Sequence, residues 1–354
     1  MNRRGIILAL LLAVLCLVLC SGCGEKILSG EVVEYRTDES GALSALVVKP
    51  ETGERVGFLL SEESWVWALT EGITAEEFAA EQPEGVYVSA ETVGRAQTIT
   101  AGDGTEIDAY PVETVKITAL RTDTVFPLSG GAQAVLWSDG WNRSYRLEDG
   151  TELLWEDGSA EVPSGNLQAN TDLSEKAKTA ISTYYREQGL LYDVPELLEA
   201  AYQNYLREGD AFDSYHAGQS ISQSAVTERV AYFITAVTLP LDSQEVTELR
   251  LSAAFDRETG AQLELEELLT CTAEEFLTAF LDAAQLTEQP LRTEMEAAFR
   301  PEYAIFLSDG MELSYPQGSL PSQEYSFIVH EDYIPDLLPL FQPWALPAAL
   351  RASK

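Results

Sequence analysis

Few side chains in this sequence could act as nucleophiles, bases or metal ligands. The chain has two histidines, His216 and His330, and it lacks the G-x-S-x-G, P-loop, G-x-G-x-x-G and H-E-x-x-H spacings. His330 precedes Glu331 and Asp332, but neighbouring residues of a strand point to opposite faces of its sheet. We therefore expect a solvated strand end there, and we assign no catalytic residue, metal ligand or cofactor.

Three other features could carry chemistry. Paired carboxylates could hydrolyse a glycan, because 58 Asp and Glu residues supply many pairs and only the structure fixes their separation. The turn Asp139-Gly140-Trp141-Asn142 could hold Ca²⁺, although the EF-hand spacing is absent. Cys271 is expected to fill core space, since a nucleophilic thiol needs a base nearby. A non-catalytic protein is the main hypothesis, and an enzyme that acts on peptidoglycan is an alternative.

Three tryptophans surround the predicted hairpins near the middle of the chain. Trp137, Trp141 and Trp155 could stack on a carbohydrate, or they could form a small satellite core. Both interpretations stay open, and the pattern favours the core.

The charge balance excludes one class of partner. A formal net charge of -36 repels nucleic acids and anionic lipid headgroups. It would steer a basic partner, but only within the Debye length of about 8 Å at physiological salt. We therefore expect no nucleic acid, and a basic protein is a possible partner.

The first 22 residues are typical of an export signal. Basic Arg3 and Arg4 precede an apolar run from Gly5 to Cys20, which is short for a spanning helix. The tetrad Cys20-Ser21-Gly22-Cys23 resembles a bacterial lipobox, with Cys20 where leucine is usual, and predicts lipidation of Cys23. Two acyl chains would then anchor the protein to the outer face of the cytoplasmic membrane. The alternative is an ordinary secreted protein.

The hydrophobic pattern predicts an α+β fold. Short strands with glycine-ended turns, the first three of which should form a meander, and one or two helical turns within residues 61–82 capped by Thr74 predict a small OB-like β-barrel over residues 23–120. Residues 121–171 are expected to form a Trp- and Gly-rich hairpin connection, with a turn at Asp149-Gly150, and a linker. Residues 172–354 alternate helix and strand patterns, which predicts an α+β domain with an antiparallel sheet and packed helices. A helix over 333–341 is expected to close this domain.

The last third of the chain carries a family resemblance. Its motifs are the strand Arg250–Asp256, the turn Asp256-Arg257-Glu258-Thr259-Gly260 and the helix start Leu263–Leu269, followed by a hairpin over 306–313. Over residues 228–341 these resemble the extracytoplasmic domain of RsiV-type anti-sigma factors, which capture lysozyme, and of PdaC-type peptidoglycan deacetylases.

The resemblance implies a wall-side module that binds a protein such as lysozyme or a wall glycan. The deacetylase catalytic domain and the cytoplasmic sigma-binding helix are both missing from the sequence, so those activities are not implied. The function that we expect is a cell-surface lipoprotein that binds a protein or the cell wall. A structural lipoprotein without a ligand is a further alternative.

Overall fold

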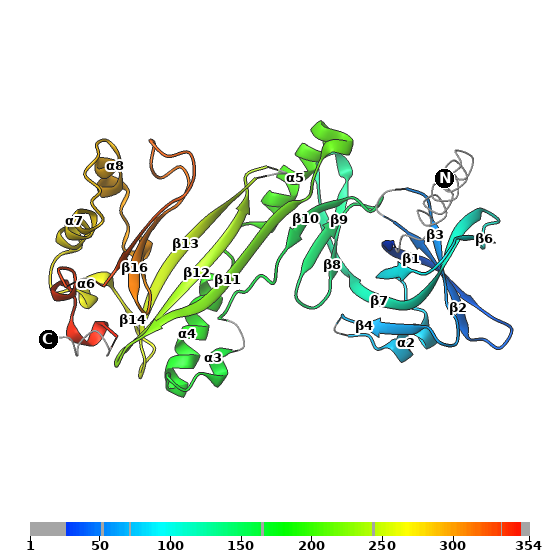
Figure 1. The fold of residues 1–354 in the computed structure, drawn as a ribbon, viewed down its shortest axis with the longest axis horizontal. Helices are drawn as coiled ribbons and strands as arrows, with labels where there is room; N and C mark the ends of the chain where they lie inside the picture. The colour runs from blue at the N-terminus through cyan, green and yellow to red at the C-terminus, as the bar shows by residue number, and fades with distance from the viewer. Residues whose placement is uncertain are drawn as a thin grey trace, which may run out of the picture. The chain divides into compact units, whose positions relative to one another are not determined.

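The computed structural model describes residues 26–50, 53–70, 72–163, 166–242, 245–333 and 335–347. Strands and helices both contribute, so the α+β class predicted from the sequence is confirmed (Figure 1). The chain divides between Leu153 and Leu154, inside strand β10 (Glu152–Glu156), into an N-terminal and a C-terminal unit.

The N-terminal unit is built on a closed circuit of paired strands. The predicted meander is confirmed, because β1, β2 and β3 pair antiparallel in sequence order. β3 then pairs parallel with β7, β7 pairs antiparallel with β5, and β5 returns to β1. The strands are β1 (Ile27–Thr37), β2 (Leu43–Lys49), β3 (Val56–Leu59), β5 (Val86–Thr92), β6 (Gln97–Thr100) and β7 (Glu106–Pro127).

The core of this unit lies inside the circuit. Alternate residues of the strands point inward, and Leu46, Val88 and Ile117 are fully buried there. Helix α2 (Ala75–Glu81) adds Phe78, which is also fully buried. The helix begins at the predicted cap, Thr74, whose side chain and that of Glu77 satisfy each other's backbone N–H groups. Burial of Phe78 contributes about 1.5–3 kcal/mol to the stability of the unit.

A strand replaces part of the region where the sequence predicted only helical turns. Residues 65–68 form β4 (Trp65–Ala68), which pairs parallel with β7. The run Trp-Val-Trp-Ala alternates with a period of two, and Val66 packs against the core. Trp65 and Trp67 therefore lie on the outward face.

A hairpin ends the N-terminal unit. Its strands are β8 (Gln133–Ser138) and β9 (Arg143–Arg146), after a short 3₁₀ turn η1 (Ser129–Gly131). The predicted turn at Asp149-Gly150 follows β9 and precedes β10. It is confirmed, with Gly150 at φ 98°, a conformation that favours glycine. Arg146 lies over the ring of Tyr87, and its guanidinium bonds Glu152 at 2.9 Å.

The sheet of the C-terminal unit lies between two layers. Phe233 of β12 faces helix α4 and contacts Tyr185, whereas the next residue back, Tyr232, stacks on Phe306 of a second sheet at 4.6 Å between ring centroids. The first sheet contains residues 154–156 of β10, β11 (Tyr215–Val226), β12 (Val230–Pro240), β13 (Val246–Asp256) and β14 (Gln262–Leu263). The second contains β15 (Ala304–Phe306), β16 (Gly310–Tyr315) and β17 (Phe327–Asp332).

Helices cover this sheet where their apolar residues recur at helical spacing. Ala177, Ile181 and Tyr185 of α4 are buried at intervals of four residues. The helices of the unit are α3 (Asn166–Ala169), α4 (Glu175–Gln188), α5 (Val194–Glu208), α6 (Leu265–Leu268), α7 (Ala273–Ala283) and α8 (Leu291–Ala298), with 3₁₀ turns η2 (Gly209–Ala211), η3 (Pro301–Tyr303), η4 (Leu338–Leu340) and η5 (Pro343–Ala345).

Two local predictions for this unit differ from the structure. The expected closing helix over 333–341 is wrong, because Pro339 within it removes a backbone donor and only the short turn η4 forms there. The expected linker contains α3, and Leu167 of that helix is buried against α4. The linker segment therefore contributes to the core.

Candidate functional site

The lipidation site predicted at Cys23 lies outside the described residues. In the part of the chain that the structure describes, none of the helices combines the length and the apolar character needed to cross a membrane. Lipidation therefore stays a prediction.

The proposed tryptophan platform is wrong. Trp137 is 5% exposed and packs edge-on against Tyr87. Trp141 is exposed in a turn, and Trp155 packs against His216 with ring centroids 4.8 Å apart. The three indoles therefore occupy three separate environments, and Trp137 adopts the core role that the sequence favoured.

The Asp139 turn uses its carboxylate for its own backbone. Asp139 accepts hydrogen bonds from the backbone N–H groups of Trp141 and Asn142 and from the Asn142 side chain. This arrangement is an Asx turn, which explains the residue types without a cation. Among the described residues, no group of three His, Cys, Asp or Glu side chains could hold a metal ion.

His330 lies on the exposed face of the edge strand β17, and its neighbours along the strand alternate between faces as predicted. Its Nδ1 is 3.6 Å from the Glu312 carboxylate, and its Nε2 is 3.5 Å from that of Asp332. Glu312 in turn forms a 2.5 Å ion pair with Arg250 of β13. This network ties the second sheet to the first.

Cys271 is half-buried and packs against the large C-terminal core, as expected for a space-filling residue. Burial, together with the nearby charge of Glu275, raises the pKa of its thiol. A raised pKa disfavours the thiolate form that a nucleophile requires.

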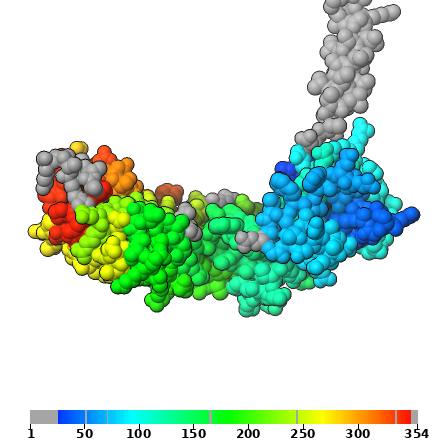
Figure 2. Space-filling view, turned by 90° about the horizontal axis from the view of Figure 1, so that it is seen from below, coloured from blue at the N-terminus to red at the C-terminus, as the bar shows by residue number. Residues whose placement is uncertain are grey.

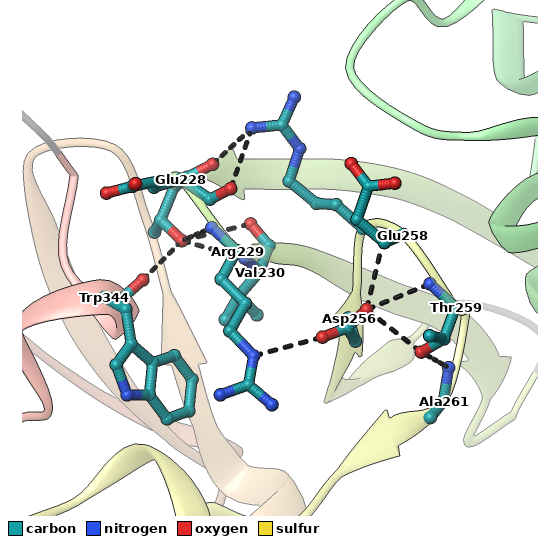
Figure 3. A network of polar contacts seen from close by, with 10 residues as sticks. Glu228, Arg229, Val230, Asp256, Glu258, Thr259, Ala261 and Trp344 are labelled. Atoms are coloured by element: carbon teal, nitrogen blue, oxygen red, sulfur yellow. Dashed lines mark hydrogen bonds and ion pairs between the residues drawn. The ribbon is translucent and has the colours of Figure 1, made fainter.

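The motif Asp256-x-x-Thr259-Gly260 has a structural role (Figure 3). Asp256 accepts hydrogen bonds from the backbone N–H of Thr259 at 2.9 Å and from Arg229 at 3.0 Å. Gly260 has φ +72°, and a Cβ there would lie 2.5 Å from that of Ala180 in α4. The glycine thus allows the turn after β13 to pack directly on the helix.

An open groove in the N-terminal unit is a concave feature that the sequence could not reveal. It has a volume of about 750 Å³ and is bordered by β1, by the segment before β5 and by the end of β7. Four carboxylates line it, from Glu31, Glu34, Glu84 and Asp123, with Arg121 as the one cationic residue of the lining. Its size falls within the range of ligand sites, and its lining favours a cationic or hydrogen-bond-donating ligand.

Tyr35 fixes one wall of this groove. Its hydroxyl donates to the backbone carbonyl of Pro83 at 2.7 Å, and its ring meets Phe78 edge-on. Burial raises the pKa of Tyr35 well above its ordinary value, so the phenol keeps its proton and this hydrogen bond. The wall is therefore preformed between β1 and the segment that follows α2.

A second surface feature was also missed from the sequence. On β4, Trp65 is 69% exposed and Trp67 is 57% exposed, and Leu69 just beyond the strand is 55% exposed. The period-two alternation of Trp65-Val66-Trp67 could have identified it. Large apolar side chains that cluster on a surface frequently mark an interaction site.

The solved structures that show low similarity to this chain include the following two proteins. The first is a DUF3298 family protein from Pseudomonas aeruginosa PAO1, with 14% identity, a TM-score of 0.33, and coverage of 65% of this chain and 95% of that chain. The second is a DUF3298 member from Bacteroides fragilis NCTC 9343, with 10% identity, a TM-score of 0.34, and coverage of 61% and 89%. No family model and no curated protein matches the sequence.

Proposed function

We propose that this protein is a lipid-anchored, non-catalytic binding protein of the cell envelope whose partner is basic. The observation that carries the proposal is the acidic groove of the N-terminal unit, whose lining residues include Glu31, Glu34, Glu84 and Asp123 and one cationic residue, Arg121. Neighbouring carboxylates make the local electrostatic potential more negative, which increases the association rate of a positively charged partner.

The sequence supports the cellular setting of this proposal. The lipobox-like tetrad ending at Cys23 would tether the chain, and the C-terminal unit resembles the wall-side domain of RsiV-type and PdaC-type proteins. A protein on the cell surface with formal charge -36 over its full sequence would attract basic proteins such as lysozyme. Binding of a basic protein should weaken as the salt concentration rises, whereas binding of a neutral cell-wall glycan should not. The salt dependence of the affinity therefore distinguishes the two partners.

We infer further that the strand circuit of the N-terminal unit is an OB-like barrel. The pairing order β1-β2-β3-β7-β5, with β3 parallel to β7, supports this assignment, as does the position of α2 between β3 and β5. A crystal structure in which β5 and β7 are not hydrogen-bonded would open the circuit and contradict it.

The test of the binding function is a calorimetric titration of lysozyme into residues 24–354, which include every described residue. We expect binding at low salt that weakens as salt rises, and at least a tenfold loss of affinity in the variant Glu84→Lys/Asp123→Lys. The control is Glu39→Lys/Glu148→Lys, which makes the same charge change in exposed turns of the same unit. Equal losses in both variants would show that net charge acts without the groove, and absence of heat at both salt concentrations would contradict lysozyme as the partner.

The lipid anchor requires a separate test. Cells that express the full chain and are fed a radiolabelled fatty acid should label the wild type and not Cys23→Ala. The variant should also leave the membrane fraction, because without Cys23 it carries none of the acyl chains that would anchor it in the bilayer. Labelling of Cys23→Ala would contradict the assignment.

A further inference from the structure

The outward face of β4 carries three large apolar side chains that no other described strand covers. Trp65, Trp67 and Leu69 are each more than half exposed, and the one strand that pairs with β4, among those described, is β7. β4 lies with α2 at the lower edge of the N-terminal unit in Figure 1, the side from which Figure 2 shows this unit in blue and cyan. We call Trp65, Trp67 and Leu69 the β4 stripe.

Core packing does not account for the β4 stripe. Val66, between the two tryptophans, already supplies the inward contact of the strand. An exposed apolar edge strand risks aggregation, and proteins usually protect such edges with charge or short length. Exposure of two large indoles on one short strand is therefore best explained by binding. Tryptophan is enriched among the residues that contribute most to binding energy.

Acidic residues flank the β4 stripe along the chain and on the paired strand β7. Glu62 and Glu63 immediately precede β4, and both are exposed. Glu113 is exposed on β7, next to Thr114, which is the register partner of Trp65. Lys116, the register partner of Trp67, is the one cation at these positions.

Aromatic faces and carboxylates together favour a cationic peptide segment. The face of an indole attracts Arg and Lys side chains, and Trp is the strongest such ring. Carboxylates at the rim would pair with the same cations, while the apolar edge of the stripe would contact their methylene stems. An anionic membrane would instead be repelled by the rim. The geometry points to the β4 stripe as a docking surface for an arginine- or lysine-rich polypeptide segment, an assignment that rests on the proposed binding of a basic partner.

The decisive experiment measures binding of two basic probes, lysozyme and a fluorescent nona-arginine peptide, to residues 24–354 and to single-tryptophan variants. Trp65→Ala and Trp67→Ala should each weaken binding about tenfold or more. Trp141→Ala is the matched control, because Trp141 is 75% exposed in the same unit and should leave affinity unchanged. Trp67→Phe should restore most of the affinity, since it keeps an aromatic face. Equal thermal unfolding of all variants will show that each is folded.

Three results would overturn the inference, and they differ in what they say about the proposed function. If both probes bind the wild type and the β4 variants equally, the stripe is not the docking surface but the basic partner stands. If neither probe binds the wild type, both proposals fail. If a neutral chitin oligosaccharide binds and depends on Trp65 while the basic probes do not bind, the stripe belongs to a glycan site.

Discussion

Strand β4 of the N-terminal unit and the sheet of the C-terminal unit place their aromatic residues in opposite environments. The N-terminal unit leaves Trp65 and Trp67 on the surface of β4, whereas the C-terminal unit buries Phe233 and Phe255 beneath α4. Both sets lie on strands with regular alternation. The difference arises from the packing layers, because the C-terminal sheet has a layer on each face, whereas the outward face of β4 is exposed.

The comparison teaches that alternation alone does not assign a face to the core. In the C-terminal unit, both faces of β12 are apolar, since Tyr232 and Phe233 point to different layers. On β4, the outward apolar residues have no layer to meet, since Trp65 and Trp67 are each more than half exposed. Such a residue is then a candidate for binding, and the same residue in the other unit would be structural.

The largest expected effect separates these roles directly. Phe255→Ala should destabilise the C-terminal unit by about 3–5 kcal/mol, because it removes a side chain that contacts Tyr184, Tyr185 and Phe233. Trp65→Ala should change the stability of the N-terminal unit by no more than about 0.5 kcal/mol. Urea unfolding followed by hydrogen exchange of peptides from each unit measures both values. Similar costs for the two changes would break the comparison.

The second prediction uses two glycines with positive φ. Gly260→Ala should cost about 2–5 kcal/mol, since backbone strain adds to a clash with Ala177 and Ala180 of α4. Gly104→Ala, in the β6–β7 turn at φ +85° with no atom within 4 Å of the new Cβ, should cost only the strain of about 1–2 kcal/mol. The same exchange measurement applies, and equal costs would mean that α4 shifts to accommodate the added methyl group.

Local signals in the sequence predicted the elements well. Thr74 begins a helix as the predicted capping residue, the meander of β1–β3 formed, and the Asp-Gly turn at Gly150 was found. These succeeded because each depends on residues within a few positions of one another. Pro339 shows the limit of such patterns, because the prediction of a closing helix over 333–341 took no account of the prolines in that range.

The candidate sites depend on distant residues and could not be predicted. Glu31, Glu84 and Asp123 line one groove only because β1, β5 and β7 close the circuit. Trp137 and Trp141 are four residues apart, yet one is buried and the other is exposed. Burial of that kind follows from strand register and layer order, which no short pattern contains. The outward face of β4 was the exception, since its alternation was visible in the sequence.

The third prediction tests whether the units differ in their local motifs. Thr74→Ala in α2 and Thr272→Ala in α7 each remove one side of a capping box, with Thr–Glu backbone contacts of 2.8–3.2 Å in both. Each should cost about 1 kcal/mol. Thermal unfolding measures the costs, with Ser at each position as the control that keeps the hydroxyl. A clearly larger loss of stability in one unit would show that the packing layers around a helix also affect how much its N-cap contributes to stability.

The smallest expected effect concerns two turn aspartates that each accept from an arginine and a threonine. The Arg55 hydrogen bond, with help from Thr105, lowers the pKa of Asp103 from 3.8 to about 2. At Asp256, burial opposes the shift, and hydrogen bonds from Thr259 and Arg229 still lower the pKa overall. Arg55→Gln should therefore raise the pKa of Asp103 toward 3.8. Arg229→Gln should raise that of Asp256 less, because the backbone donor of Thr259 contributes more there than the arginine.

The sign of the stability change follows from the lowered pKa of Asp103. A carboxyl that is more acidic in the folded chain stabilises it above the unfolded pKa of 3.8, and this contribution is lost as the pH falls through about 2. Arg55→Gln should therefore destabilise the protein slightly at pH 5, and the difference from wild type should shrink as the pH falls toward 2. Carbon-13 titration of the two carboxyls measures the pKa values. An Asp103 pKa that stays near 2 in Arg55→Gln would mean that the hydrogen bonds of the turn hold the carboxylate without the arginine.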